Sequence, residues 1–556
     1  MAIPAFIALA DPRLFVWKKN LSSKYYPSHA PFESQFTGML DFGKGRKYFV
    51  FSKDDMYNPF DVQFVMEKPF LESARSLVIG EADWEGTFSS YPNAIYDEEL
   101  KKYFMYYRCF TREVDYANED EDSLKRKQTT CVATSNDGIT FSRPSLHIYP
   151  TKNGDPTNII HHGPTAHNFV VFHGDLQRTG KRFIAIGGVD GVIPADSGIY
   201  LFGSDDGFHF DPLKDSPILT KKHNRDEYHS YFDSMNTVSW DTNREVYWVW
   251  LRMNSGVTGY HRRQTQYLQF EDIVNGNPSP LADVMMINAT FNHYVSCVSL
   301  VASEKSASYF VAIPISFPLY ESVLALSRDG ITFVNPKEDI SAYITDPFVD
   351  SRGPPTYENY SYRQGCIPGV LPSTDGNRWL FYHLINYHHY TTPRVNGETA
   401  GVIQSFSVPK WGFTSVHAED GYFFTSPMEI DSDSVLANVG FSFAARRLTG
   451  HSKYSSSISF ELYPCVYPNT TSNAPENRGL DASEVKSFRT QVEPIWSSGE
   501  FSVQGEINVV QELHLKEQSN RILSGVLQHE VARTRACLVW KVSLHHIAFH
   551  GFWIYE

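Results

Sequence analysis

The chain has 556 residues, of which 42% are hydrophobic, 15% aromatic and 20% charged, and its formal net charge is -14. This length predicts two to four domains, unless a single large repeat architecture takes up most of the chain. The negative charge, with acids and bases interspersed, excludes a nucleic-acid footprint and a polybasic membrane surface, and no segment approaches the roughly 18 apolar residues of a membrane-spanning helix.

Residues 1–44 are rich in Pro, Ser and Tyr and are predicted to form an N-terminal extension. The segments after them are short, rich in Val, Ile, Tyr, Phe and Trp, and bounded by Gly, Pro, Asn and Asp, which is typical of strands. Five similar units predict a five-bladed β-propeller over residues 45–416, with the first strand of each blade lining a central channel. Each unit has a polar lead-in, an apolar strand, a turn and a second strand that ends in aromatics, and the units begin at Tyr91, His167, Tyr231, Asn292 and Gln364.

The pattern changes after residue 416. Short alternating strands such as FSFAARRL and ACLVWKVSL are separated by the loop PNTTSNAPENRGLDAS. We therefore predict a C-terminal β-sandwich domain over residues 417–556 and an all-β fold class for the chain.

A turn motif recurs in the units as SNDGITF at 135–141, SDDGFHF at 204–210 and SRDGITF at 327–333. The Asp can accept hydrogen bonds from N–H groups of the turn, the Gly can take positive φ, and the aromatic can return to the core. Because a catalytic group is not usually copied around a ring, we interpret the motif as structural. It resembles the Asp-box of sialidases, but Phe replaces Trp and the SxDxG spacing is absent, which disfavours a sialidase.

The six cysteines show no CxxC spacing and so indicate no zinc site. Cys109 and Cys131 could bridge neighbouring strands, although buried free thiols fit equally well. The N-terminal IPAFIALA lacks the features of a signal peptide. An extracellular or secretory-lumen location is nevertheless favoured by four sequons, at Asn20, Asn288, Asn359 and Asn469.

Several stretches together resemble a family of glycoside-hydrolase-like proteins, similar to glycoside hydrolase families 32 and 43, whose members mostly have no assigned function. They are KYFVFSKDDMYNPFDVQFV, ADWEG, YPNAIYDEELKKYFMYYRC, GPTAHNFVVF, FDSMNTVSWDTNREVYWVWLR, LALSRDGITF and WGFTSVHAEDGYFFTSP. The resemblance covers roughly residues 45–430 and implies a five-bladed propeller followed by a β-sandwich. It also implies three channel acids: a nucleophile or base on the first blade, a pKa-tuning Asp on a middle blade, and a Glu general acid.

On this sequence Asp83 or Glu85 matches the first-blade position, and Asp233, in FDSMN, matches the middle-blade position. Cleavage of a glycosidic bond needs at least two carboxyl groups, one protonated at the leaving oxygen and one ionised. Asp233 could instead cap a tight turn. Glu321 and Glu227 are candidates for the general acid by residue type, with a surface or loop location as the alternative for both.

Candidates for substrate binding also lie near the strand starts. His167 and Asn168 could contact sugar hydroxyls or satisfy backbone groups between blades, and Trp84 could stack on a sugar ring or pack in the core. No cluster of histidines in the sequence matches a metal-ligand signature, so we predict no metal site and no cofactor. A structural Ca²⁺ in the propeller channel is left as a possibility. The further candidates for substrate binding are Asn236, Arg252 and His388.

These patterns favour a carbohydrate-active protein, a glycoside hydrolase that cleaves an oligo- or polysaccharide in the propeller funnel through paired carboxylates. The alternative is a non-catalytic glycan-binding or structural surface protein with a degenerate glycosidase site. It is raised by the fifth unit, where the resembled family often has an acid and this chain has Arg363 and Gln364 in YRQG. The sequence does not predict an oligomeric state.

Overall fold

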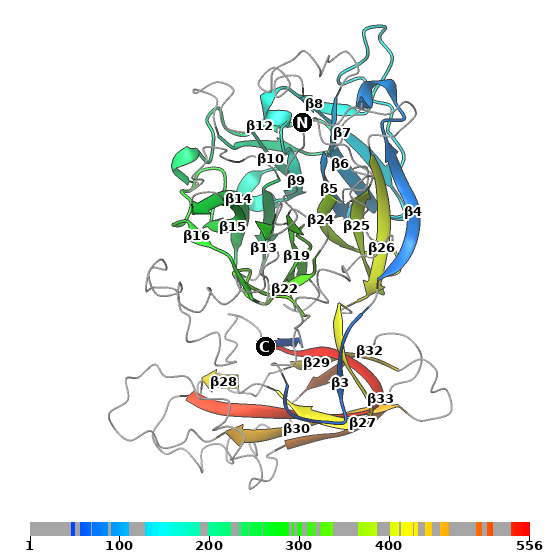
Figure 1. Cartoon of the computed structure of the whole chain (residues 1–556), viewed down its shortest axis with the longest axis vertical. Coiled ribbons are helices and arrows are strands. Elements are labelled where there is room, and N and C mark those ends of the chain that lie inside the picture. The colour runs from blue at the N-terminus through cyan, green and yellow to red at the C-terminus, as the bar shows by residue number, and fades with distance from the viewer. Residues whose placement is uncertain are drawn as a thin grey trace, which may run out of the picture.

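Nearly all regular structure in the chain is β-strand (Figure 1). Within the described residues, α3 (Leu176–Thr179) is a single α-helical turn, and η3 (Asp83–Glu85), η4 (Pro164–Ala166) and η5 (Lys221–His223) are 3₁₀ turns. The all-β prediction is confirmed, and the predicted extension 1–44 lies outside the described residues. The computed structural model describes residues 46–49, 56–67, 69–86, 90–110, 128–188, 198–223, 232, 235–242, 244–257, 260–287, 292–293, 297–302, 308–314, 316–317, 323–336, 365–385, 401–410, 413–425, 428–431, 440–447, 456–465, 496–502, 509–514 and 535–555.

The strands from β4 (Phe70–Ile79) to β26 (Gly401–Pro409) form the upper body in Figure 1. In its described parts, five larger sheets follow one another along the chain. The first contains β5 (Ser90–Asp97), β6 (Lys102–Phe110), β7 (Gln128–Ser135) and β8 (Ile159–His162). The second contains β9 (Val170–His173), β10 (Phe183–Gly187), β11 (Tyr200–Ser204) and β12 (Asp211–Pro212). The third contains β13 (Thr237–Asp241), β14 (Val246–Val257), β15 (Tyr260–Phe270) and β16 (Ala282–Asp283).

The fourth and fifth sheets each contain one strand that comes from an earlier part of the chain than their other strands. The fourth contains β19 (Val298–Ala302), β20 (Ser308–Ala312), β22 (Ala325–Ser327) and β23 (Thr332–Val334), and β17 (Met285–Ile287) joins β23 in parallel. The fifth contains β24 (Gly365–Pro372), β25 (Arg378–Ile385), β26 (Gly401–Pro409) and, from far earlier in the chain, β4 (Phe70–Ile79). A separate pair is formed by β18 (Asn292–His293) and β21 (Ser316–Phe317).

The first strands of the five sheets contact one another in a cycle, from β5 to β9, β13, β19, β24 and back to β5. Where β24 meets β5, a Cβ on Gly369 would lie 2.3 Å from the carbonyl oxygen of Ala94, so only glycine permits this approach. Because β4 pairs with β26, strands from both ends of the ring complete the fifth sheet. This arrangement is consistent with a β-propeller.

A hydrophobic cluster fills each space between neighbouring sheets, and the side chains alternate between clusters along a strand. On β6, Tyr103 and Tyr107 belong to the cluster shared with the fifth sheet, whereas Phe104 and Tyr106 belong to the cluster shared with the second sheet. All four side chains are buried. A strand buried on both faces needs a continuous run of large apolar residues, which explains the sequence KYFMYYRCF.

The structure decides between the two alternatives for Cys109 and Cys131. Cys109 on β6 and Cys131 on β7 form a disulfide, with their Cα atoms 5.9 Å apart, so they are not free thiols. Cys297, immediately before β19, is also disulfide-bonded.

The repeated turn follows the third strand of three sheets. In its first copy, the Oδ1 atom of Asp137 accepts hydrogen bonds from the N–H groups of Ile139 (2.7 Å) and Thr140 (2.9 Å). Gly138 has a φ of 74°. The same backbone contacts recur at Asp206 and Asp329, which confirms the structural interpretation of the motif.

These turns also tie neighbouring sheets together. The carbonyl oxygen of each motif glycine accepts a hydrogen bond from an aromatic side chain on the second strand of the adjacent sheet. The donors are the Tyr382 hydroxyl to Gly138 (2.8 Å), the Tyr106 hydroxyl to Gly207 (3.0 Å) and the Trp250 indole N–H to Gly330 (3.1 Å).

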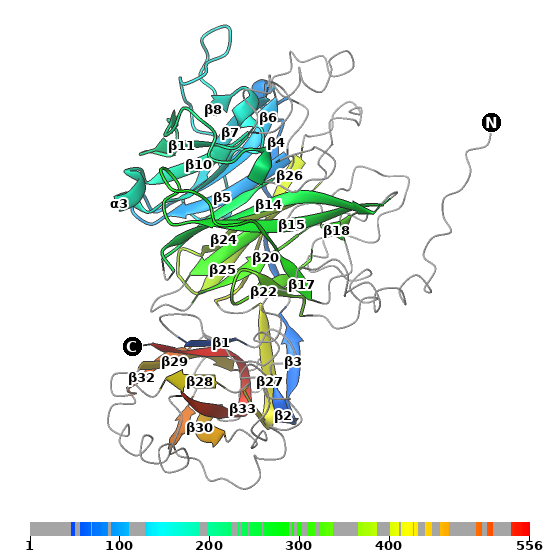
Figure 2. The same ribbon diagram turned by 90° about the vertical axis from the view of Figure 1, so that its left-hand side faces the viewer.

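The lower body is built on one sheet that holds ten of the described strands (Figure 2). Its 21-residue strand β33 pairs with β27, β28 and β30 through its earlier part and with β29 and β1 through its later part. The strands are β1 (Arg46–Phe49), β2 (Tyr57–Phe60), β3 (Gln63–Met66), β27 (Thr414–Phe424), β28 (Met428–Asp431), β29 (Gly440–Arg447), β30 (Ser457–Cys465), β31 (Trp496–Ser502), β32 (Val509–His514) and β33 (Arg535–Tyr555).

This sheet differs from the predicted division of the chain. We expected the propeller to begin at residue 45, yet β1, β2 and β3 pair with β33 and β27 of the lower body. The predicted boundary at residue 416 also falls inside β27. A local hydrophobic pattern predicts that a strand forms but does not identify a pairing partner far along the chain. The domain boundaries themselves stay predictions. Among the described residues, no helix is long and apolar enough to cross a membrane.

Candidate active site

The start of each first strand in the first four sheets carries a left-handed backbone residue that is not glycine. Tyr91 (φ 54°) lies at the start of β5, Asn168 (φ 56°) just before β9, and Cys297 (φ 43°) just before β19. Phe232 (φ 59°) precedes β13 by a few residues. Such conformations cost on the order of 1–3 kcal/mol each and cluster at functional sites. These strand starts are therefore the candidate functional site.

A buried polar group lies at the junction of the first and second sheets. The Arg108 guanidinium carbon, near the end of β6, lies 4.8 Å from the centre of the Tyr91 ring, and its Nη1 atom lies 3.4 Å from His167 Nδ1. The same His167 Nδ1 is 2.8 Å from Gln128 Oε1. An amide oxygen can only accept and a guanidinium can only donate, so Nδ1 cannot form a hydrogen bond with both partners at once. The shorter contact, to Gln128, fits a ring with its proton on Nδ1.

Sequence reasoning selected His167 but missed Arg108 and Gln128. Arg108 and Gln128 are both buried. The signal for Arg108 was present in the chain, because it is the one charged residue inside the apolar run YFMYYRCF. Gln128 follows the basic segment LKRK and carried no comparable signal.

Asn168 and Asn236 both point to the backbone before the third sheet. Asn168 Nδ2 donates to the carbonyl oxygen of Phe232 (3.2 Å), and Asn236 Nδ2 donates to the same oxygen (3.1 Å). The N–H of Arg252 donates to Asn236 Oδ1 (3.3 Å). Asn168 Oδ1 has no hydrogen-bond partner among the described residues. The substrate-binding roles of Asn168, Asn236 and Arg252 stay predictions, but the contacts of Asn236 are those of a residue that orders the backbone.

The ADWEG segment forms the turn η3 after β4 and places its two acids in different surroundings. Glu85 is fully buried, whereas Asp83 is exposed to solvent. Glu85 Oε1 accepts from Arg143 Nε (2.7 Å) and from the Tyr107 hydroxyl. Glu85 Oε2 accepts from Arg143 Nη2 (2.8 Å) and from the N–H of Gly80 (2.8 Å).

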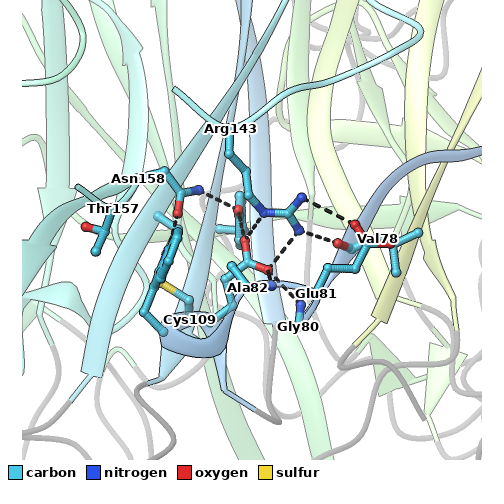
Figure 3. Close-up of polar contacts among 12 residues, drawn as sticks. Val78, Gly80, Glu81, Ala82, Cys109, Arg143, Thr157 and Asn158 are labelled. Carbon is cyan, nitrogen blue, oxygen red and sulfur yellow. Dashed lines mark hydrogen bonds and ion pairs between the residues drawn. A yellow bond between two sulfur atoms is a disulfide. The ribbon is translucent and has the colours of Figure 1, made fainter. Parts of the chain in front are cut away.

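The network around Glu85 joins the fifth sheet to the first (Figure 3). Arg143, which follows the turn motif of the first sheet, also donates from Nη2 to the carbonyl oxygen of Val78 on β4. Asn158 donates to the Tyr107 hydroxyl (2.7 Å) and accepts from the indole N–H of Trp84 (2.6 Å). Trp84 is only partly buried and packs against the cluster between these sheets.

Protonation in this network follows from burial and charge. Burial lowers the pKa of Arg143, but its hydrogen bonds to Glu85 and the nearby anionic groups outweigh burial and raise that pKa overall. Burial raises the pKa of the Tyr107 hydroxyl well above its usual value, and the neighbouring Glu85 raises it further. Tyr107 therefore remains a donor at physiological pH. A carboxylate that is committed to this many protein donors is a poor nucleophile, which favours Asp83 over Glu85 as the first-blade acid, although both catalytic roles stay predictions.

One histidine near these strand starts, His161, packs among aromatic side chains, as a structural residue does. His161, on β8, stacks on Phe169 at a ring-centre distance of 4.7 Å and meets Phe202 edge-on at 4.9 Å. Burial, with a smaller effect of His162, lowers the pKa of His161 to about 4. It is therefore neutral at physiological pH.

Several predicted site residues lie outside the described residues, so their roles stay predictions. The described parts of the chain gather no group of three or more His, Cys, Asp or Glu side chains that could hold a metal ion. The absence of a cofactor and the option of a channel Ca²⁺ stay predictions too. The residues outside the described ranges are Asp233, Glu227, Glu321, Arg363, Gln364 and His388.

No protein-family model matches the chain, and no curated protein matches it significantly. Solved structures that resemble it include fructofuranosidase from Schwanniomyces occidentalis complexed with fructose, at 12% identity and a TM-score of 0.35, covering 88% of this chain and 99% of that one. Exo-inulinase from Aspergillus awamori has 10% identity and a TM-score of 0.34, with coverages of 87% and 99%. A GH62 hydrolase in complex with xylotriose has 8% identity and a TM-score of 0.38, with coverages of 61% and 97%.

The structural neighbours are thus carbohydrate-active enzymes of the kind that the sequence resembles. At these identities and TM-scores they carry no argument about the activity of this chain.

Proposed function

We propose that the protein is a glycoside hydrolase whose substrate binds where the first strands of a five-bladed propeller begin. The observation that carries the proposal is the concentration, at these strand starts, of buried hydrogen-bonding side chains and left-handed non-glycine backbone. Arg108, His167 and Asn168 offer donors and acceptors of the kind that hold the hydroxyl groups of a sugar. The cycle of five first strands supports five blades, and the way β33 pairs with strands along its whole length supports a C-terminal sandwich.

The proposed chemistry uses paired carboxyl groups. Asp83 acts as the nucleophile or base, Asp233 tunes the pKa values, and Glu321 is the candidate general acid. Asp83 is exposed, as a group that meets a substrate from solvent must be. Glu85 is kept as the alternative first-blade acid.

Hydrolysis of a glycan panel tests this proposal. The wild type should release products, and Asp83→Asn and Asp233→Asn should each lower turnover by about a hundredfold or more. The turnover of Glu85→Gln, measured at a temperature where this variant is folded, is compared with that of Asp83→Asn to show which of the two residues is the first-blade acid. Equal turnover in Asp233→Asn and wild type would remove Asp233 from the mechanism.

A specific observation favours the alternative of a non-catalytic glycan-binding protein. One of the two acids at the first-blade position, Glu85, is neutralised by Arg143 and fully buried. If Asp83 does not act chemically, the site keeps its polar groups without an available first-blade acid. Binding on a glycan array without product release from any bound glycan would establish this alternative.

We further propose that the chain works in an oxidising compartment, outside the cell or in a secretory lumen. The disulfide of Cys109 and Cys131 and the disulfide-bonded Cys297 support this, because such bonds are rare in reducing compartments. Mass spectrometry of the protein from its native source should find the Cys109–Cys131 bond and glycans on the sequon asparagines. Reduced thiols at both positions would refute the proposal.

A further inference from the structure

The η3 turn that carries Asp83 is closed by the side chain of its own last residue. The N–H of Gly80 donates to Glu85 Oε2 (2.8 Å), and the N–H of Glu85 donates to the carbonyl oxygen of Ala82 (3.0 Å). The first of these bonds reaches back across the whole turn to the end of β4. Asp83 lies inside this closed loop and is exposed to solvent, whereas Glu85 is 0% exposed.

The Arg143 guanidinium fastens this loop to the first and fifth sheets. Its Nε and Nη2 atoms donate to the two carboxylate oxygens of Glu85 (2.7 and 2.8 Å), and Nη2 also donates to the carbonyl oxygen of Val78 on β4 (Figure 3). The backbone before Arg143 is held by the first sheet, because the N–H of Ser142 donates to the carbonyl oxygen of Thr134 on β7 (2.9 Å). A planar guanidinium that binds both oxygens of a carboxylate fixes its orientation as well as its distance.

The residue that follows Asp83 is held by the first sheet too. The indole N–H of Trp84 donates to Asn158 Oδ1 (2.6 Å), and Asn158 Nδ2 donates to the carbonyl oxygen of Val132 on β7 (2.8 Å). Asn158 is fully buried, so water does not compete for these hydrogen bonds. The two residues after Asp83 are therefore both restrained by side chains that the first sheet supplies.

The turn lies at the end of the first sheet where the candidate site begins. The Tyr107 hydroxyl on β6 donates to Glu85 Oε1. The next residue on the strand is Arg108, which pairs in register with Ser90 at the start of β5 and whose Nη1 atom lies 3.4 Å from His167 Nδ1. Successive side chains of a strand point to opposite faces, so the turn and His167 flank the same end of β6 from its two sides.

We infer that Arg143 is a positioning residue for the carboxyl group of Asp83. The inference rests on the proposed function, in which Asp83 is the nucleophile or base. A single 3₁₀ turn has little stability of its own, so η3 depends on the side chains that bind it to keep its conformation. The carboxyl group of Asp83 moves with this turn, and displacing a reacting group by about 1 Å can cost on the order of a hundredfold in rate.

Two variants loosen the turn without leaving a buried charge unpaired. Arg143→Lys keeps a cation beside Glu85, but one ammonium nitrogen cannot reproduce the planar fork that holds both carboxylate oxygens. The double variant Arg143→Met with Glu85→Leu replaces the buried pair by apolar side chains of similar size, which is often neutral for stability. The double variant serves only to follow the backbone, because Glu85 is the alternative first-blade acid. Denaturant unfolding of both variants sets the conditions under which each is folded.

Arg178→Lys is the matched control. Arg178 joins the second sheet to the third, because its Nη1 atom donates to the carbonyl oxygens of Glu245 (2.9 Å) and Glu271 (2.7 Å). Its Nη2 atom donates to the carboxylate of Glu245 (3.0 Å). Its side chain is 31% exposed, against 21% for Arg143. The same substitution thus removes the fork of two inter-sheet arginines, one that binds η3 and one that binds the third sheet.

The first readout is amide hydrogen exchange of residues 80–86, measured on the whole protein. We expect about tenfold faster exchange there in Arg143→Lys and in the double variant, and wild-type exchange in Arg178→Lys. The second readout uses a glycan that the wild type hydrolyses. In Arg143→Lys we expect kcat to fall about tenfold with a smaller change in KM, and the pH profile of kcat to shift because the surroundings of the Asp83 carboxyl group change. Arg178→Lys should match the wild type in both kinetic measurements.

Wild-type exchange at residues 80–86 in Arg143→Lys and in the double variant would overturn the inference. An equal kinetic change in Arg178→Lys would also overturn it, because the effect would then come from loosened sheets in general. So would faster exchange with an unaltered kcat and pH profile, because Arg143 would then order the turn without placing Asp83. If the wild type hydrolyses no glycan, the proposed function fails. The exchange measurement then decides alone: faster exchange in Arg143→Lys supports Arg143 as the residue that holds the turn with Asp83, and unchanged exchange refutes it.

Discussion

Glu85→Gln is expected to lower the free energy of unfolding by about 2.5–4 kcal/mol. The buried carboxylate accepts from Arg143 Nε, Arg143 Nη2, Gly80 N–H and the Tyr107 hydroxyl. A glutamine keeps one acceptor oxygen but turns an NH₂ group toward two of these donors. A lost hydrogen bond costs about 1 kcal/mol for a neutral donor and about 1.5–3 kcal/mol for a charged one, which gives the stated sum.

The assay is denaturant unfolding followed by two probes, with Glu81→Gln as the control. Glu81 Oε2 lies 3.5 Å from Nη1 of the same Arg143, but its side chain is 53% exposed. Solvent screens such a pair, so we expect Glu81→Gln to change stability by less than about 0.5 kcal/mol. The comparison therefore uses one guanidinium, one kind of substitution and two degrees of burial.

Two results would refute this reasoning. Equal stability of Glu85→Gln and wild type would mean that the ion pair is not an anchor between the first and fifth sheets. Loss of hydrolysis in Glu85→Gln with unchanged stability would make Glu85 the catalytic acid and remove the argument for Asp83.

Three further expectations concern the scaffold. Tyr382→Phe deletes the donor to the Gly138 carbonyl and should lower the free energy of unfolding by about 1 kcal/mol in a denaturant titration. Gly138→Ala forces a Cβ into a left-handed turn, within 2.6 Å of a leucine methyl, and should lower it by more. Equal stability of either variant and wild type would contradict the inter-sheet role of the motif. His161 has its pKa lowered to about 4 from 6.5, so the folded state resists its protonation and stability should fall as the pH drops from 6.5 toward 4. His161→Gln should flatten that part of the stability profile measured by thermal unfolding, and an unchanged slope would show that this histidine is not its source. Cys131→Ser should lower stability by about 2–4 kcal/mol, and reductant should destabilise the wild type more than this variant, which keeps the disulfide of Cys297.

The repeated turn shows how far local patterns reach. The Asp-Gly pairs at 137–138, 206–207 and 329–330 fold as their chemistry requires, because their hydrogen bonds lie within the turn itself. A fourth copy, STDGNRW at 373–379, has the matching contact, because Asp375 Oδ1 accepts from the N–H of Asn377 (3.0 Å). Unlike the other three, this copy follows the first strand of its sheet rather than the third.

The candidate site was predicted less completely. Polar residues ahead of an apolar run singled out the strand start that contains His167 and Asn168, and the role of both residues in a site stays a prediction. The opposite environments of Asp83 and Glu85 were not foreseeable, because they depend on Arg143, which is 58 residues away from Glu85 in the sequence. The placement of Arg108 beside His167 likewise depends on the meeting of two sheets.

The sequence by itself determined the all-β class, the strand content and the turns, because alternation, β-branched and aromatic runs, and Asp-Gly chemistry act over a few residues. Only the tertiary structure decided which strands pair across the chain, so that β4 completes the fifth sheet and β1 to β3 join the lower one. It also decided that Glu85 is paired with Arg143 and that two asparagines donate to the carbonyl oxygen of Phe232. Burial and contact between distant segments set these properties, and neither is encoded in any short stretch of residues.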